Sequence, residues 1–223
     1  MTVVADRHLR VGGPIHRGTP SGSPGPLRPL GRVDLEAAEE AVRALLESLG
    51  TDLGAEGLAE TPRRVAAAFA ELLTPAPFRP TTFPNDEGYD ELVVARSIPL
   101  RSLCQHHLLP FWGVAHVGYL PGERILGLSK LARVVELFAR DLQTQERLTS
   151  QVAGWLEEQL SPRGVGVVVD AEHLCMTVRG VKAPGVRTVT SALRGRVRDD
   201  PRTRSEFLSL AMAQAPLGGR GGS

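Results

Sequence analysis

Hydrophobic residues in the first part of the chain recur at the spacing of amphipathic helices. One helical face collects Ala38, Val42, Leu45, Leu46 and Leu49. Gly50 suits the end of this helix, because glycine readily adopts the left-handed conformation found there. A second helix is predicted to begin at Thr61 as N-cap, with Pro62 in the first helical position, and to end before a proline-rich connection over 75–84.

Strand patterns dominate after that connection, and further helices interrupt them. Runs rich in β-branched residues predict strands over 92–94, 113–119, 165–170, 173–179 and 186–197. Apolar residues at helical spacing predict helices over 130–142, 146–160 and 203–213. Strands that flank a pair of helices indicate an α+β domain with a mainly antiparallel sheet.

Composition divides the chain into three parts. Residues 1–32 are rich in Gly, Pro, Ser and Arg with few apolar anchors, so we expect a disordered arm. Residues 215–223 predict a flexible tail for the same reason. The folded domain then spans 33–214, with N-terminal helices within 33–78 and the core and final helix within 88–214.

The charge balance argues against several classes of partner. Lys and Arg number 26 and Asp and Glu 25, so the net charge of +1 creates no global field for nucleic acid or an anionic membrane. The basic run 194–198 is followed by two aspartates and lacks interleaved aromatics, unlike a nucleic-acid module. No apolar run approaches the roughly 20 residues of a membrane span, and no signal-peptide pattern opens the sequence. We therefore expect no nucleic-acid or membrane partner, and a reducing cytoplasm.

Each of the two cysteines sits beside histidine. Cys104 is followed by His106 and His107, and His173 precedes Cys175. Thiolate and imidazole are preferred zinc ligands, and Cys104, His107 and Cys175 would leave one position of a tetrahedral ion open for water, as in catalytic zinc sites. His106 and His173 would then be free for proton transfer. A disulfide between the cysteines, or two inert buried thiols, are the other interpretations.

Strand geometry bears on the second half of this site. If residues 173–179 form one unbroken strand, one face carries His173, Cys175, Thr177 and Arg179. That face would present a base, a metal ligand and an anion-binding cation in a row. A row of polar residues that simply faces solvent is the alternative.

Two further groups could bind a substrate. Ser129 is a good N-cap, and Lys130 and Arg133 lie one turn apart at the start of a helix, which together make a phosphate site. A solvated basic helix face is the ordinary alternative. Glu146 falls at the joint between two helices, where its carboxylate could accept two N–H bonds from a guanine edge, although exposed glutamates are common.

Several runs together resemble the GTP cyclohydrolase I family. The clearest are SLCQHHLLPF at 102–111, GLSKLAR at 127–133, QTQERLT at 143–149 and EHLCMTVRG at 172–180. Further matches lie at 188–192 and 204–208, and weaker ones at 60–65 and 88–91. The runs keep the family order and a compatible spacing over residues 34–211, which is far more specific than any one motif.

The resemblance implies a T-fold, in which an antiparallel sheet carries two helices on one face after an N-terminal helical hairpin. Sheets of neighbouring subunits would join into a barrel, and two facing pentamers would form a homodecamer. It also implies a zinc-dependent hydrolase that converts GTP and water to 7,8-dihydroneopterin triphosphate and formate, the first step of tetrahydrofolate and pterin biosynthesis.

Positions in these motifs assign roles to individual residues. The zinc ligands are matched by Cys104, His107 and Cys175, and the proton-shuttling residues by His106 and His173. Glu146 matches the carboxylate that holds the guanine edge, and Gln145 beside it belongs to the substrate-binding residues. The triphosphate cradle is matched by Ser129, Lys130, Arg133 and Arg179, and a phosphate contact from a neighbouring subunit by Arg64.

One residue departs from the family pattern. The family has Cys-Glu-His-His where this chain has Gln105 in the acidic position. Glutamine keeps the size and the carbonyl acceptor but loses the charge and gains a donor. Loss of a carboxylate that orients an imidazole or a cation would shift a pKa or loosen the geometry, whereas a carboxylate that only structures the loop is replaceable.

Two other functions fit the same residues. One is a paralogous enzyme of the same fold that feeds a deazapurine pathway, with the same first product. The other is a catalytically silent zinc protein that binds GTP, against which the intact His106, His173 and Glu146 argue.

Overall fold

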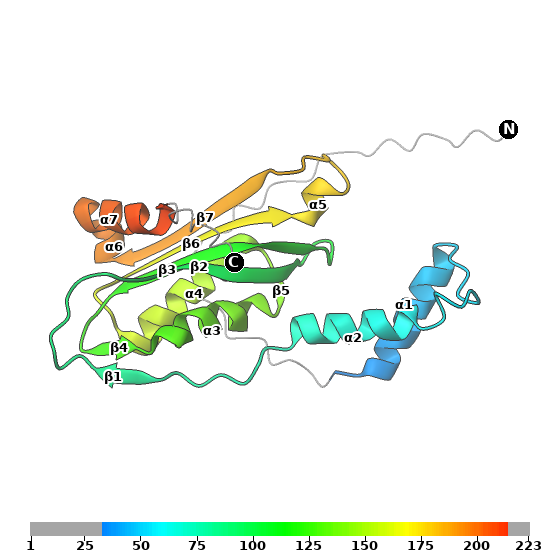
Figure 1. Ribbon diagram of the computed structural model, residues 1–223, viewed down its shortest axis with the longest axis horizontal. Coiled ribbons are helices and arrows are strands. Elements are labelled where there is room, and N and C mark those ends of the chain that lie inside the picture. Colours follow the sequence, from blue (N-terminus) through cyan, green and yellow to red (C-terminus); the bar gives the residue numbers. More distant parts are fainter. Residues whose placement is uncertain (1–32, 214–223) are drawn as a thin grey trace, which may run out of the picture.

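A five-stranded sheet in the order β5-β2-β3-β6-β7 forms the centre of the protein (Figure 1). The computed structural model describes residues 33–213, so the predicted arm 1–32 and tail 215–223 lie outside the described residues. The strands are β2 (Val93–Cys104), β3 (Pro110–Leu120), β5 (Leu142–Gln143), β6 (Gly164–His173) and β7 (Arg187–Gly195). All neighbours pair antiparallel except β5, which runs parallel to the end of β2. The fold is thus mixed α+β with a mainly antiparallel sheet, as predicted.

The register of the sheet brings the ends of three strands together. β2 and β3 form a hairpin, with Leu103 opposite Pro110 at its closed end. Phe111, at the start of β3, lies opposite His173, the last residue of β6. Cys104 pairs with Gln143 of β5. The hairpin loop, the end of β6 and the residues after β5 therefore meet at one end of the sheet.

Helices α3 (Leu128–Ala139) and α4 (Gln145–Leu160) cover one face of the sheet (Figure 1). Their apolar stripes face the strands and include the buried Leu131, Val134, Val135, Phe138, Leu148, Val152 and Leu156. The strands contribute alternate residues to the same core, because side chains of a strand alternate between faces. On β6 this series is Val165, Val167, Val169 and Ala171. His173 continues that alternation and so lies on the helix side.

The other face of the sheet is covered at one end by α6 (Arg196–Asp199) and α7 (Pro201–Met212) (Figure 1). Phe207 of α7 is fully buried in a second apolar cluster with Leu92, Leu120 and Val168. Burial of such a ring stabilises the docking of the helix by about 1.5–3 kcal/mol.

Two helices and a small sheet precede and flank this core. α1 (Leu35–Ser48) and α2 (Thr61–Leu73) contact one another, and α1 buries none of its residues among the described part of the chain. β1 (Thr82–Pro84) pairs with β4 (Arg124–Leu126). No helix within residues 33–213 is both long and apolar enough to span a membrane.

The structure corrects several predicted element ends. The predicted strand 173–179 is wrong, because β6 stops at His173 and the helical turn α5 (Leu174–Thr177) follows. Ser129 is not an N-cap: α3 begins at Leu128 and Gly127 occupies the cap position without a side-chain bond. Thr61 is likewise the first helical residue of α2 rather than its cap. The strand predicted to run to 197 ends at Gly195, and α6 takes over.

Candidate active site

The β2–β3 hairpin loop places Cys104 and His107 beside each other. The His107 N–H donates to the Cys104 carbonyl at 3.3 Å and the Leu108 N–H donates to the same oxygen at 2.9 Å, so the chain turns tightly after Cys104. Leu108 has a φ of +56°, a left-handed conformation that closes the turn. The Cys104 Sγ then lies 3.7 Å from the His107 Nδ1. A turn of this length explains why the two residue types stand three positions apart.

Cys175 reaches the same place by a different route from the predicted one. Because β6 ends at His173, the parity argument for a common face of residues 173–179 does not hold. The helical turn α5 instead folds the chain back at the end of the sheet, next to the hairpin loop that the β3–β6 register has placed there. One ligand atom from each of Cys104, His107 and Cys175 lies within 4.8 Å of the other two.

This cluster has the chemistry of a metal site. Two sulfurs and one imidazole nitrogen are the donors that zinc prefers, and three protein donors leave a tetrahedral position open. Both cysteines are free thiols, so the disulfide interpretation does not apply. Burial raises the pKa of the Cys175 thiol, and the neighbouring Cys104 raises it further. A cation between the two sulfurs would favour their deprotonation, and the donor set fits a metal ion.

His106 lies next to the cluster and is held by Gln105. The Cys104 Sγ is 3.7 Å from the His106 Nδ1, and the Gln105 Nε2 is 3.3 Å from the His106 Nε2. The Gln105 Oε1 accepts a hydrogen bond of 2.8 Å from the Arg147 Nη1. Gln105 therefore links the ring of His106 to a cation on α4.

Arg147 is anchored by its other nitrogens. Its Nε donates to the Gln143 Oε1 at 2.8 Å, and its Nη2 donates to the Leu142 carbonyl. Gln143 is buried and its amide donates to the Gln151 Oε1 at 2.8 Å. The sequence reasoning missed Arg147 and Gln143, although both stand in the run QTQERLT that carried part of the resemblance.

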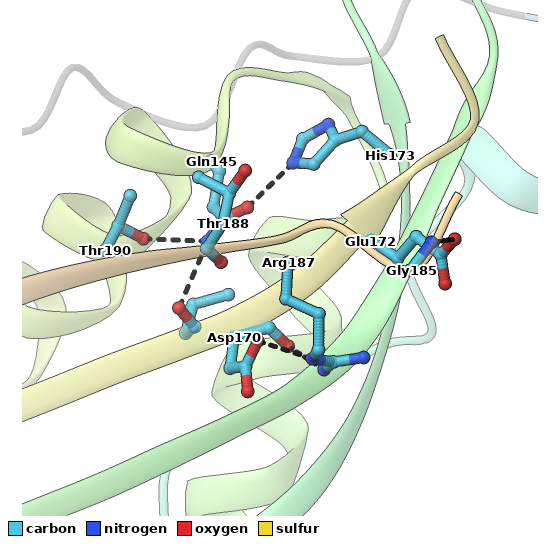
Figure 2. A network of polar contacts seen from close by, with 9 residues as sticks. Gln145, Asp170, Glu172, His173, Gly185, Arg187, Thr188 and Thr190 are labelled. Carbon is cyan, nitrogen blue, oxygen red and sulfur yellow. Dashed lines mark hydrogen bonds and ion pairs between the residues drawn. The ribbon is translucent and has the colours of Figure 1, made fainter. Parts of the chain in front are cut away.

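His173 is enclosed by an aromatic ring and an amide. Its ring stacks on Phe111 with 4.5 Å between centroids and 10° between planes. Its Nε2 lies 2.7 Å from the Oε1 of Gln145, the first residue of α4 (Figure 2). Burial lowers the pKa of His173, and the carboxylate of Glu146 partly offsets this effect. Burial thus disfavours the charged form of the imidazole.

These residues line one pocket of about 220 Å3 at the end of the sheet. Its wall includes Cys104, His106, His107, Gln145, Glu146, His173 and Cys175. Glu146 is exposed in the first turn of α4, where Thr144 caps the helix by accepting from the Arg147 N–H at 3.2 Å. A carboxylate, two histidines and a metal-binding cluster thus face one cavity.

The predicted phosphate contacts do not line this pocket. Arg133 lies in a second pocket of about 370 Å3 between α2, α3 and β2, together with Arg101, Arg140 and Glu71. The Lys130 Nζ sits 5.6 Å from the ring centroid of Phe78. Ser129 is exposed at the start of α3, and Arg64 is exposed on α2. Arg179 does not line this pocket either, but its charge partly offsets the raised pKa of Cys175.

Comparison with known proteins agrees with the motifs. The family model for GTP cyclohydrolase I matches residues 38–212. A GTP cyclohydrolase 1 of Streptomyces avermitilis is 53% identical over 192 residues, which cover 83% of this chain and 94% of that protein. The GTP cyclohydrolase 1 of Mycobacteroides abscessus is 53% identical over 190 residues, covering 82% and 93%. That of Aquifex aeolicus is 51% identical over 178 residues, covering 80% and 97%. The chain therefore belongs to the GTP cyclohydrolase I family of enzymes.

Proposed function

We propose that this protein converts GTP and water to 7,8-dihydroneopterin triphosphate and formate, with zinc as its metal. The observation that carries the proposal is the single pocket in which a Cys-His-Cys cluster, two histidines and Glu146 meet. Ring opening of guanine needs an activated water, proton transfer and a group that recognises the base. The two histidines can transfer protons and Glu146 can recognise the base. The Cys-His-Cys donor set supports a metal that would activate the water.

Zinc would be held by Cys104, His107 and Cys175, whose soft donors favour it over magnesium or calcium. When bound, zinc acts as a Lewis acid and brings the pKa of water towards about 7. Thiolate ligands also require a reducing compartment, which we expect to be the cytoplasm.

His106 and His173 are the proton-transfer residues in this proposal. They line the same pocket from the hairpin loop and from the end of β6, so both are placed to act on a purine bound there. Glu146 accepts N–H bonds from the guanine edge and so selects the base. Loss of a general acid or base commonly costs about 10²- to 10⁴-fold in rate, which is the drop in kcat that we expect for alanine at either histidine.

The triphosphate contacts point to an oligomer. Ser129, Lys130, Arg133 and Arg64 do not line the metal pocket of their own chain. We propose that neighbouring chains bring these cations to the pocket, within the barrel and homodecamer that the family resemblance implies. Leu45 on α1 and Leu49 at the C-terminal cap of α1 are exposed in the single chain and would be covered in such an assembly. In that assembly α1 and α2 would form the helical hairpin.

The test is to incubate the purified full-length protein with GTP, measure formate, and record pterin fluorescence after oxidation. Wild type should bind zinc, release formate and give the fluorescent product. Cys104→Ser and Cys175→Ser should each lose both zinc and activity, with zinc measured by elemental analysis. His116→Asn is the matched control, because His116 lies on β3 outside the cluster and should keep its metal.

Three outcomes would count against the proposal. Full activity in either metal-poor cysteine variant would remove zinc from the mechanism. Tight GTP binding without formate would make the protein a silent GTP-binding protein. Retained zinc in both cysteine variants would assign the metal to other residues.

A further inference from the structure

Gln145 is buried yet carries a full set of hydrogen-bonding groups. Its side chain is 2% exposed at the start of α4. The Nε2 donates to the Thr188 carbonyl at 2.8 Å and to the Val169 carbonyl at 3.1 Å, and lies 3.2 Å from the Thr190 Oγ1 (Figure 2). Backbone carbonyls only accept, so the NH2 end of the amide must face them. The orientation of the amide is therefore dictated by two neighbouring strands.

The other end of the amide is the Oε1, which faces the ring of His173. The separation of 2.7 Å from the ring atom is a hydrogen-bond distance. A ring carbon in that position would stand about 3.3–3.6 Å away, so the facing atom is a nitrogen. Stacking on Phe111 at 4.5 Å keeps the ring in this plane. An amide oxygen only accepts, and the nitrogen must therefore carry the hydrogen.

We propose that Gln145 is a positioning residue that fixes the ring hydrogen of His173 on Nε2, so that Nδ1 is the proton-accepting atom. The inference deepens the proposed function, on which the catalytic role of His173 rests. Within residues 33–213 the ring's hydrogen bond runs from Nε2 to Gln145, and no bond to Nδ1 is present. A proton taken from substrate at Nδ1 leaves both ring nitrogens protonated, and the bond to Gln145 stays in place throughout.

This role differs from direct contact with GTP. Both polar atoms of the Gln145 side chain are already engaged by the protein, and turning the amide oxygen towards a ligand would leave the His173 N–H without its bond to Gln145. Leaving such a buried group unpaired costs about 1–3 kcal/mol. The side chain therefore acts on substrate through the imidazole.

Nitrogen NMR distinguishes the tautomers directly. The sample is the full-length, zinc-loaded protein labelled with 15N at histidine, and a His173→Gln variant assigns the signals. We expect a protonated Nε2 and an unprotonated Nδ1 for His173 at neutral pH. A protonated Nδ1 beside a bare Nε2, or rapid averaging of the two forms, would overturn the proposal, and neither result depends on turnover.

Two variants test the effect of this hydrogen bond on the kinetics. Gln145→Met keeps the length of the side chain but removes the acceptor, so the Nε2–H should exchange faster. The kcat should fall about 10- to 100-fold, as is typical when the hydrogen-bond partner that orients a functional histidine is lost, while KM for GTP changes little. Thr190→Val is the matched control, because the two carbonyls still orient the amide. It should keep the wild-type His173 signals.

A change in KM rather than in kcat would identify another role for Gln145. A raised KM with unchanged His173 signals in Gln145→Met would mean that the residue contacts substrate and would overturn the proposal. If Gln145→Met does not fold, the wild-type spectrum alone decides. A wild type with the expected tautomer but without formate release would contradict the proposed function and leave the tautomer assignment standing.

Discussion

Gln105 is the residue at which this chain differs from the family pattern within the metal loop. Its Oε1 accepts from Arg147 at 2.8 Å, and its Nε2 faces the His106 Nε2 at 3.3 Å. The donor that glutamine gains relative to glutamate is thus directed at a candidate catalytic ring. Gln105 offers Arg147 an uncharged acceptor in place of a carboxylate, and the other nitrogens of Arg147 still bind Leu142 and Gln143.

The variant Gln105→Glu should keep or raise turnover. A carboxylate would strengthen the contact to Arg147, since it would add the attraction of a negative charge to a bond whose donor is already charged. The pair is exposed, so the gain in stability should stay within about 1 kcal/mol. Steady-state kinetics and a melting curve check both statements. A large drop in kcat would show that the amide donor towards His106 serves the reaction.

His116 makes the stability of the protein sensitive to acid. This histidine is buried on β3, and its Nδ1 has no hydrogen-bond partner among the described residues. Burial lowers its pKa, the charge of Asp170 partly offsets this, and Arg96 lowers it further. Below about pH 6.5 the unfolded chain then binds more protons than the folded one, so stability falls as the pH falls towards the folded pKa.

Replacement by an apolar residue should remove this dependence. His116→Leu should lose less stability than wild type between about pH 7 and pH 5.5, measured as the shift in the urea midpoint at fixed zinc. His173 has a pKa lowered in the same direction, so part of the acid effect should remain. Equal midpoint shifts in both proteins would remove His116 as a cause.

At the scale of elements, α7 is fixed to the sheet by a close approach between Phe207 and Gly166. A Cβ built on Gly166 would lie 2.5–2.7 Å from three carbons of the Phe207 ring, which is fully buried and cannot retreat. Gly166→Ala should therefore lower the free energy of unfolding by about 1–3 kcal/mol, the usual cost of overpacking a core. Denaturant titration measures the loss.

Gly57 provides the control for that substitution. A Cβ there would meet no atom within 4 Å, and its φ is not in the left-handed region. Gly57→Ala should leave the unfolding midpoint unchanged or raise it slightly, because alanine restricts the unfolded chain. A loss as large as that of Gly166→Ala would mean that contact with Phe207 is not the cause.

Elements with a long apolar period could be predicted from the sequence, and short ones could not. The helices that cover the sheet and the main strands follow from residues such as Leu131, Val152 and Val167, whose spacing reports burial on one face. The helical turn 174–177 has no such signal, because its conformation is set by the end of β6 and the contacts around it. The two-residue strand β5 forms only by pairing with β2 near the distant Cys104, so the local sequence gives no signal for it either.

The candidate site divides in the same way. The neighbouring Cys and His residues predicted the cluster, because the type of side chain determines which metal it can bind. The cluster is assembled from the hairpin loop and α5 by the strand register, and this register could not be predicted from the local sequence. Roles that depend on hydrogen-bond direction, as for Gln145 and Arg147, could be read only from the geometry.

At the scale of the whole molecule, the metal pocket and the predicted triphosphate cations form two separate halves. The cluster lies at the end of the sheet, whereas Arg133 lines another pocket between α2, α3 and β2. We propose that one GTP engages both halves only where different chains contribute them. Activity should therefore depend on association of chains that each bring an intact half.

Mixing two inactive variants tests this dependence. Cys104→Ser lacks the metal half and Arg133→Ala the cation half, so each alone should have little activity. Co-expression should yield mixed oligomers in which some pockets combine an intact cluster from one chain with an intact Arg133 from another, and GTP turnover should return well above either variant alone. The pair Cys104→Ser and Cys175→Ser is the control, because both changes damage the same half and no pairing restores a complete cluster. No recovery in the test pair with mixed oligomers present would place both halves of the site in one chain. Recovery in the control pair would instead mean that two chains share the metal cluster itself.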